Sequence, residues 1–259
     1  MTASRFAFLD WPGPIAFAHQ GGANEFPENS MKAFESVVGL GYRYIETDVH
    51  ATSDGVVVVM HDDSLDRTTD HSGVIANLPW SVVKEAKIGG TELVPRLDEV
   101  LDGLPGTRFN IDPKVDGVVE PLIDVVRRTG AVDRVCIGSF KDARLAQVRA
   151  ALGPTLCTAM GTATTIRLRL ASYLPDALAP LVARSDAACA QVPVTQGPVT
   201  ITDARLVHLA HALGLAVHVW TIDDRAEMER LLDLGVDGVM TDAPSLLKDV
   251  LLARHQWFS

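Results

Sequence analysis

Two carboxylates near the start of the chain have the spacing of a cation site. Glu46 and Asp48 lie two residues apart in Tyr44–Val49, a short run with the apolar character of a strand. Side chains at positions i and i+2 of a strand leave the same face, so both carboxylates can converge on one ion. Carboxylate oxygens favour Mg²⁺ or Ca²⁺, with Mn²⁺ as a third candidate. Glu46 would be costly to bury in such a run without a partner.

Two histidines follow apolar runs of the same kind. His19 comes directly after Ile15–Ala18, and His61 comes directly after Val56–Met60. Either histidine alone is more often an ordinary hydrogen-bonded side chain than a catalyst. Imidazoles titrate near neutrality, however, and two of them beside a carboxylate cluster match the acid and base that in-line displacement at phosphorus needs. A bound metal ion would hold the non-bridging oxygens of such a substrate.

Asp112 and Lys114 close a third run, Arg108–Ile111. The Asp112 carboxylate can give the cation a third oxygen ligand. Lys114 can place a fixed positive charge beside a phosphate, or it can instead neutralise Asp112 or Glu46. Both interpretations of Lys114 stay open at this point.

Apolar runs and amphipathic segments alternate along the chain, which predicts a repeated strand and helix. The eight expected strands are Ile15–His19, Tyr44–Val49, Arg108–Ile111, Val135–Ser139, Thr155–Met160, Ala188–Val192, Ala216–Thr221 and Gly238–Thr241. The helical segments between them include Ser30–Gly39, Val118–Thr129, Ala143–Leu152, Thr202–Leu213 and Arg225–Leu234, and glycines follow several of them. Eight such units predict an α/β TIM (β/α)8 barrel, whose reactive residues stand at the carboxyl ends of the strands. No GxGxxG or GxxxxGK[ST] motif supports an open nucleotide-binding sheet.

An extra apolar run, Val56–Met60, follows the second strand after a tight turn at Ser53–Gly55. It predicts a hairpin extension of that strand. Residues 62–92 then lack strong periodicity, which indicates a small insertion after the second strand.

Composition limits the classes of protein and partner. With 259 residues and 47% hydrophobic content, the chain is expected to form one barrel domain, residues 1–259. A net charge of −10 argues against a nucleic-acid surface. No apolar run approaches about 18 residues, so no transmembrane segment is expected, and the broken apolar character of the first 18 residues makes the cytoplasm the default location. The three cysteines lack metal-ligand spacing and are expected to be buried free thiols.

Several ordered motifs resemble the glycerophosphodiester phosphodiesterases, which are barrels of this size with a small insertion after the second strand. The motifs are His19-Gln20-Gly21-Gly22, Pro27-Glu28-Asn29-Ser30, Glu46-Thr47-Asp48-Val49, Met60-His61-Asp62, Leu65-Asp66-Arg67-Thr68-Thr69 and Gly235-Val236-Asp237-Gly238 with Thr241-Asp242. The resemblance implies that His19 and His61 are the acid–base pair. It also implies that Glu46, Asp48 and Asp112 bind one divalent metal ion and that Lys114 contacts phosphate. The implied reaction releases glycerol 3-phosphate and an alcohol.

Two positions depart from the family pattern. The family usually has arginine where this chain has Gln20, so a bidentate phosphate clamp is replaced by a neutral amide. The third metal position is commonly glutamate and here is the shorter Asp112. We still expect Gln20 to face the substrate, and Trp220 to contact its glycerol or alcohol part.

Two other functions remain open on the sequence. The segment Thr164–Leu181, with Arg167 and Arg169 among apolar residues, can line an acyl groove or contact a lipid surface, which would suit a lysophospholipase D. A barrel that binds phosphodiesters without cleaving them is the non-enzymatic alternative. The sequence does not indicate an oligomeric state.

Overall fold

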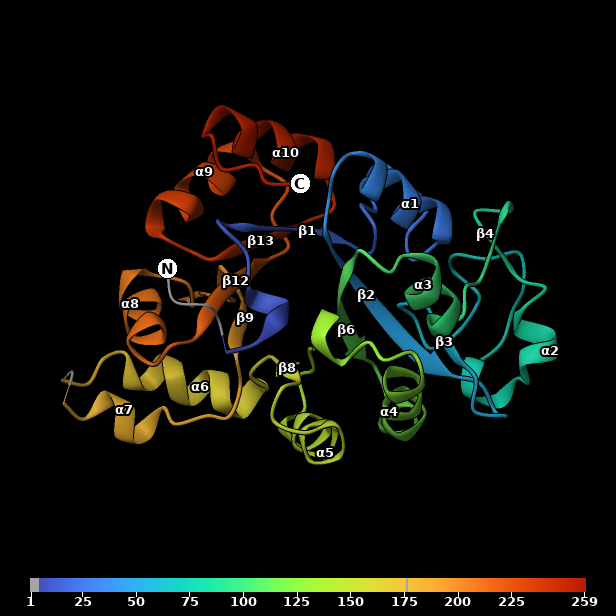
Figure 1. The fold of residues 1–259 in the computed structure, drawn as a ribbon, viewed down its shortest axis with the longest axis horizontal. Coiled ribbons are helices and arrows are strands. Elements are labelled where there is room, and N and C mark those ends of the chain that lie inside the picture. Colours follow the sequence, from blue (N-terminus) through green and yellow to red (C-terminus); the bar gives the residue numbers. More distant parts are fainter. Residues whose placement is uncertain (1–4, 176) are drawn as a thin grey trace.

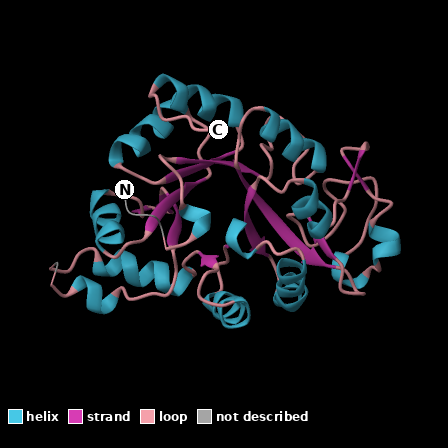
Figure 2. Cartoon of the chain, in the orientation of Figure 1, coloured by secondary structure: helices cyan, strands magenta, loops and turns pink. Residues whose placement is uncertain are grey.

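Parallel strands form the inner wall of a barrel, and helices cover its outside (Figures 1 and 2). The computed structural model describes residues 5–175 and 177–259. Over this part of the chain the parallel strands are β1 (Ile15–His19), β2 (Tyr44–Ala51), β6 (Arg108–Pro113), β7 (Val135–Ile137), β8 (Cys157–Thr158), β9 (Cys189–Pro193), β12 (Ala216–Trp220) and β13 (Gly238–Thr241). Their spatial order is β8-β7-β6-β2-β1-β13-β12-β9, so the predicted TIM-like barrel is confirmed.

The barrel closes weakly between β8 and β9. The strand β8 contains two residues, although the sequence pattern predicted Thr155–Met160. One isolated parallel bridge, between Ala159 and Cys189, links the two ends of the sheet among the described residues. Backbone hydrogen bonds from Met160 to Cys189 (2.9 Å) and from Ala188 to Thr158 (2.8 Å) accompany it. Closure therefore depends on a few backbone contacts.

Helices follow most of the strands and pack against the outside of the sheet. They are α1 (Met31–Gly39), α3 (Leu97–Gly103), α4 (Val119–Arg128), α5 (Asp142–Leu152), α6 (Thr162–Ala171), α7 (Ala179–Val182), α8 (Ala204–Ala212), α9 (Arg225–Leu234) and α10 (Pro244–Ala253). Ser30 caps the start of α1, because its Oγ accepts a hydrogen bond from the Ala33 amide at 3.1 Å. The glycines expected to end helices all have positive φ, as at Gly235 (91°) after α9.

The barrel interior is filled by aromatic and small side chains. Phe17 and Tyr44 pack at 5.3 Å between ring centroids, and both are buried. The short 3-10 helix η1 (Ala7–Leu9) brings Phe8 against Tyr44, whose hydroxyl donates to the Phe8 carbonyl at 2.7 Å. Burying each such side chain contributes about 1.5–3 kcal/mol, so this N-terminal segment helps to fill the core.

The residues after β2 form the predicted insertion. The strand β3 (Val57–Val59) pairs antiparallel with β2, as the hairpin pattern predicted. The insertion continues with η2 (Ile75–Asn77), α2 (Trp80–Val83), β4 (Lys87–Ile88) and β5 (Glu92–Leu93). Its buried apolar residues form a small core of their own, which includes Val58, Met60, Leu65, Ile75, Val83, Ala86, Ile88 and Val94.

Towards the C-terminal side, the connection after β9 contains a small hairpin of β10 (Thr195–Gln196) and β11 (Val199–Thr200). In the middle of the chain, the short 3-10 helices η3 (Asp116–Val118) and η4 (Val132–Arg134) flank α4. Of the helices described here, none has the length and apolar character needed to cross a membrane.

Candidate active site

Strand register brings the predicted side chains together. His19 on β1 aligns with Glu46 on β2, and Glu46 aligns with Asn110 on β6. Two residues further along, Asp48 aligns with Asp112. Because alternate residues share one face of a strand, these side chains form two successive rows inside the barrel mouth. The carboxylates of Glu46 and Asp48 both face the same cavity, as their spacing predicted.

The cavity at the carboxyl ends of the strands has a volume of about 690 Å³. Its polar side is lined by His19, Glu46, Asp48, His61, Asn110, Asp112 and Lys114. Its opposite side is largely apolar and includes Phe140, Met160, Ile166, Ile201 and Trp220. The Trp220 ring meets the Phe140 ring edge-on, with centroids 6.0 Å apart. The cavity therefore joins a charged wall to an apolar one.

His19 is held between two carboxylates. Its Nδ1 lies 2.7 Å from Oδ1 of Asp242, and its Nε2 lies 3.6 Å from Oε2 of Glu46. Burial by itself would lower the pKa of His19, but the negative charges of Glu46 and Asp242 and the hydrogen bond to Asp242 outweigh it and raise the pKa to about 9. His19 is therefore held in its protonated form near neutrality.

His61 stands at the end of β3 and is fixed through the insertion. Its Nδ1 lies 2.7 Å from Oδ1 of Asp62. Asp62 also accepts hydrogen bonds from the Arg67 guanidinium, which reaches on to Glu28 at 2.6 and 3.0 Å. The hydrogen bond from Arg67 lowers the pKa of Asp62 to about 2, so this carboxylate stays ionised beside His61.

Lys114 lies between two of the predicted metal ligands. Its Nζ is 2.6 Å from Oδ1 of Asp48 and 3.1 Å from Oδ2 of Asp112. Burial lowers the pKa of Lys114, but the two carboxylates outweigh it and the pKa is raised. Of the two interpretations of Lys114, the structure shows the neutralising contact, while the side chain also lines the cavity.

Glu46, Asp48 and Asp112 are three neighbouring carboxylates with one lysine among them. Burial, followed by repulsion from Asp48, raises the pKa of Glu46, which is 6% exposed. Burial also raises the pKa of Asp112. In the described part of the chain, the oxygens of Glu46, Asp48 and Asp112 do not all lie within 4.8 Å of one another, the spacing expected of ligands around one ion. The Lys114 ammonium lies beside Asp48 and Asp112. Their oxygen donors and excess negative charge still fit a hard divalent cation.

The family is decided by comparison with known proteins. The model of the glycerophosphoryl diester phosphodiesterase family matches residues 19–246. The chain belongs to this family. Because it belongs to this family, the chain is a phosphoric diester hydrolase. A relative from Mycobacterium tuberculosis, named probable glycerophosphodiester phosphodiesterase 2, is 39% identical over 251 residues, which cover 96% of this chain and 95% of the relative.

Solved structures of the family share the fold. A crystal structure from Silicibacter pomeroyi matches with a TM-score of 0.81 at 23% identity and covers 98% of this chain and 100% of its own. An Oleispira antarctica phosphodiesterase, solved in complex with the product sn-glycerol-3-phosphate, matches with a TM-score of 0.75 at 24% identity, over 92% of this chain and 97% of its own. These likenesses confirm the barrel architecture of a glycerophosphoryl diester phosphodiesterase.

Gln20, the position where the family usually has arginine, turns towards the carboxylates. It has a φ of 52° and is 6% exposed. Its Nε2 donates to Oδ2 of Asp48 at 2.9 Å, and its backbone amide donates to Oε2 of Glu46 at 3.3 Å. Gln20 is not among the described residues that line the cavity. Its expected contact with substrate stays a prediction, whereas its contact with Asp48 was not foreseen.

Sequence reasoning also missed the role of two supporting residues. Asn29 donates to Oδ2 of Asp48 at 3.2 Å and accepts from Thr47 at 2.7 Å, so it orients the same carboxylate as Gln20. Asp242 was named as part of a family motif but was not connected to His19. The signals were present, because Asn29 belongs to the second motif of the family and Asp242 directly follows β13, the strand next to β1.

Proposed function

We propose that this chain hydrolyses small glycerophosphodiesters to glycerol 3-phosphate and an alcohol, with the help of a divalent metal ion. The observation that carries the proposal is the shared cavity. His19 and His61, from two different parts of the fold, line the same space as Glu46, Asp48 and Asp112. Family membership and the glycerol 3-phosphate complex of the Oleispira antarctica relative support the choice of substrate.

Glu46, Asp48 and Asp112 are the residues that would hold the metal ion. A hard cation bound there would offset the negative charge that develops on the phosphate oxygens. Burial, together with repulsion from Asp48, raises the pKa values of Glu46 and Asp112, and a bound cation would relieve the cost of keeping these buried carboxylates ionised. Gln20 and Asn29 keep Asp48 in place through its second oxygen.

The two histidines divide the proton transfers. His61, beside ionised Asp62, takes the proton of the attacking hydroxyl, which belongs to water or to the glycerol 2-position. The bond between phosphorus and the alcohol oxygen then breaks. His19, which Asp242 and Glu46 keep protonated, gives its proton to that oxygen, and the alcohol leaves neutral. Attack by water gives glycerol 3-phosphate directly, whereas attack by the glycerol hydroxyl gives a cyclic phosphate that a water molecule then opens to glycerol 3-phosphate.

The rest of the cavity receives the remainder of the substrate. Lys114 adds positive charge to the polar wall beside the phosphate. Trp220 and Phe140 offer apolar ring surface to the glycerol or alcohol part. No charged side chain on this apolar wall selects a particular alcohol among the described lining residues.

A direct assay tests this proposal. The protein is stripped with a chelator, supplied in turn with Mg²⁺, Ca²⁺ or Mn²⁺, and given glycerophosphocholine. We expect release of glycerol 3-phosphate with at least one ion and loss of turnover in Glu46→Gln and Asp112→Asn. Asp249→Asn, on the exposed face of α10, is the matched control and should keep full activity. Tight substrate binding without product, whichever ion is added, would show a binding barrel instead.

A lysophospholipase D activity is the second candidate, and the apolar wall favours it. Ile166 lines the cavity and is 53% exposed, and the neighbouring Leu170 is 62% exposed. An acyl chain can leave the cavity along this side of α6. The two arginines of the predicted acyl groove differ in position. Arg167 is exposed, whereas Arg169 turns inward and pairs with Asp203 at 2.8 Å.

The two activities are separated by the choice of substrate. Faster turnover of lysophosphatidylcholine than of glycerophosphocholine would favour the second candidate. In that case Ile166→Asp should slow cleavage of lysophosphatidylcholine selectively. If the small substrate is preferred, the same variant should leave both rates in their original ratio.

A further inference from the structure

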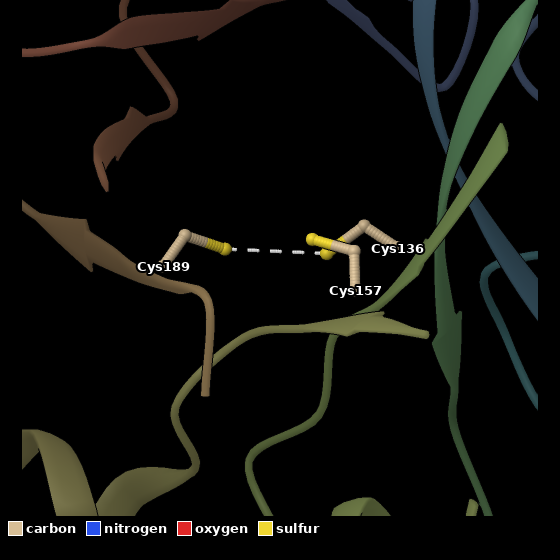
Figure 3. Close-up of side chains that lie close together, drawn as sticks. All are labelled: Cys136, Cys157 and Cys189. Carbon is tan, nitrogen blue, oxygen red and sulfur yellow. Dashed lines mark hydrogen bonds between the residues drawn. The ribbon is translucent and has the colours of Figure 1, made fainter. Parts of the chain in front are cut away.

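Three cysteines meet inside the barrel, away from the proposed phosphodiester chemistry. Cys136 on β7, Cys157 on β8 and Cys189 on β9 are free and fully buried. Their sulfur atoms all lie within 4.8 Å of one another, and the Sγ atoms of Cys136 and Cys189 are 4.0 Å apart. Figure 3 shows Cys189 pointing across the barrel towards the other two thiols. The sequence predicted buried free thiols but not their convergence.

The strands place this cluster one layer below the cavity. Gly138, Ala159 and Gln191 each lie two residues beyond one of the cysteines and line the cavity. Because alternate residues of a strand share a face, the cysteines point into the barrel beneath that lining. The register of Cys136 with Cys157 on the neighbouring strand keeps two of the sulfurs side by side.

A fourth donor, His218 on β12, lies next to the cluster without a partner. The imidazole is 0% exposed, and within the described residues neither ring nitrogen makes a hydrogen bond. Buried polar atoms nearly always have a partner, so two unpaired ring nitrogens are an exception that needs a cause. The His218 nitrogens do not lie within 4.8 Å of all three sulfurs, as the sulfurs do of one another, but the ring is close enough to Cys189 to help lower the pKa of that thiol, after the larger effect of hydrogen bonds from Cys136 and Cys157.

We propose that Cys136, Cys157 and Cys189 bind one zinc ion, and that the unpaired His218 ring moves towards the sulfurs to become the fourth ligand. Three cysteines and one histidine are a common ligand set for structural zinc. At a Zn–S distance of about 2.3 Å, two sulfurs of a tetrahedral site lie about 3.8 Å apart, close to the 4.0 Å between Cys136 and Cys189. Binding releases three thiol protons to solvent and leaves three thiolates and a neutral imidazole on Zn²⁺, with a net charge of −1.

This site differs from the carboxylate site in both chemistry and purpose. Thiolates select soft, thiophilic ions, whereas the oxygen ligands above them suit hard cations. The ligands come from β7, β8, β9 and β12, so one ion would connect both edges of the weak closure between β8 and β9. The zinc ion would therefore stabilise the barrel rather than take part in phosphodiester cleavage.

Metal analysis of the full chain tests the proposal. Protein made with zinc in the growth medium is washed with EDTA, separated by gel filtration and measured for zinc by mass spectrometry. We expect one zinc per chain in the wild-type protein and in Asp48→Asn, and loss of zinc in Cys136→Ser, Cys157→Ser and Cys189→Ser. His218→Phe keeps the ring volume but removes the fourth ligand, so its zinc content after the EDTA wash should fall below one per chain. Cobalt in place of zinc should give sulfur-to-cobalt charge-transfer absorption.

Val217→Ala is the matched control for loss of core volume. Val217 neighbours His218 on β12 but packs into the outer core between sheet and helices, so the variant should retain zinc. Folded wild-type protein with three reactive thiols and no zinc after growth in zinc would overturn the proposal. A mass lower by two hydrogens, from a disulfide between Cys136 and Cys189, would overturn it too. Should the serine variants fail to fold, the zinc content and cobalt spectrum of the wild type still decide.

Discussion

Nδ1 of His19 lies 2.7 Å from Oδ1 of Asp242, a carboxylate 223 positions away in the sequence. The contact exists because β1 and β13 are neighbours in the barrel, with Ala18 aligned to Thr241. It leaves the other ring nitrogen of His19 directed towards Glu46 and the cavity. If His19 is the acid proposed above, Asp242 acts on the reaction through it, as a positioning residue.

Asp242→Asn should lower kcat by about 10- to 100-fold, a part of the about 10²–10⁴ that a positioned acid or base supplies. The amide keeps the shape of the carboxylate but removes the charge that favours protonated His19. The pH profile should shift with it, because the pKa of His19 falls when this charge is lost. Steady-state kinetics across pH measure both effects, and an unchanged profile would remove Asp242 from this role.

His61→Ala should lower turnover by about 100-fold or more if His61 is the base. The insertion supplies a matched control in His71, which pairs with Asp70 at 2.9 Å much as His61 pairs with Asp62 at 2.7 Å. His71 is absent from the cavity lining, so His71→Ala should keep normal turnover. Equal losses in the two variants would mean that the insertion had been disturbed as a whole.

Gln20→Arg should lower the KM for glycerophosphocholine by about 10-fold, which corresponds to 1.4 kcal/mol. A charge-assisted hydrogen bond to phosphate contributes about 1.5–3 kcal/mol, enough for this change. Gln20→Met keeps the length of the side chain without the amide and isolates the effect of losing the contact with Asp48. Loss of activity in both variants would show instead that the amide is needed to hold Asp48.

The stability of the metal-free protein should depend on pH through His19. Its pKa is raised from 6.5 to about 9 in the folded state, so its stabilising contribution is complete below about pH 6.5 and is lost as the pH rises through about 9. This shift corresponds to at most about 3.4 kcal/mol. Urea unfolding in EDTA at pH 6 and pH 10 measures it. The difference in free energy of unfolding between the wild type and His19→Asn should be larger at pH 6.

Strand positions were predictable where a short apolar run ends in a polar residue. Ile15–His19 and Gly238–Thr241 were predicted with the bounds that the structure has, because β-branched and small residues pack into a buried parallel sheet there. The predicted strand Thr155–Met160 shrinks to Cys157–Thr158. Its ends lie at the closure of the barrel, where pairing depends on the distant segment that contains Cys189.

The sequence predicted which residues lie at the site better than it predicted where their side chains point. Glu46 and Asp48 face one cavity because strand alternation alone requires it. The direction of Gln20 depends on its positive φ, which no local pattern in the sequence marks. The contact of Lys114 with Asp48 depends on the register of β6 with β2, which only the assembled sheet fixes.

The ion pairs of Arg67 connect the insertion to the barrel. They tie Asp62 in the insertion to Glu28 in the loop after β1, so one guanidinium joins the two peptide segments that carry His61 and His19. The insertion has an apolar core separate from that of the barrel. Of the two proposed proton carriers, His19 therefore stands on a barrel strand and His61 beside a segment with its own apolar core, and Arg67 links the loops that follow them. Loss of the Arg67 ion pairs should therefore change the spacing of the two imidazoles while leaving both apolar cores intact.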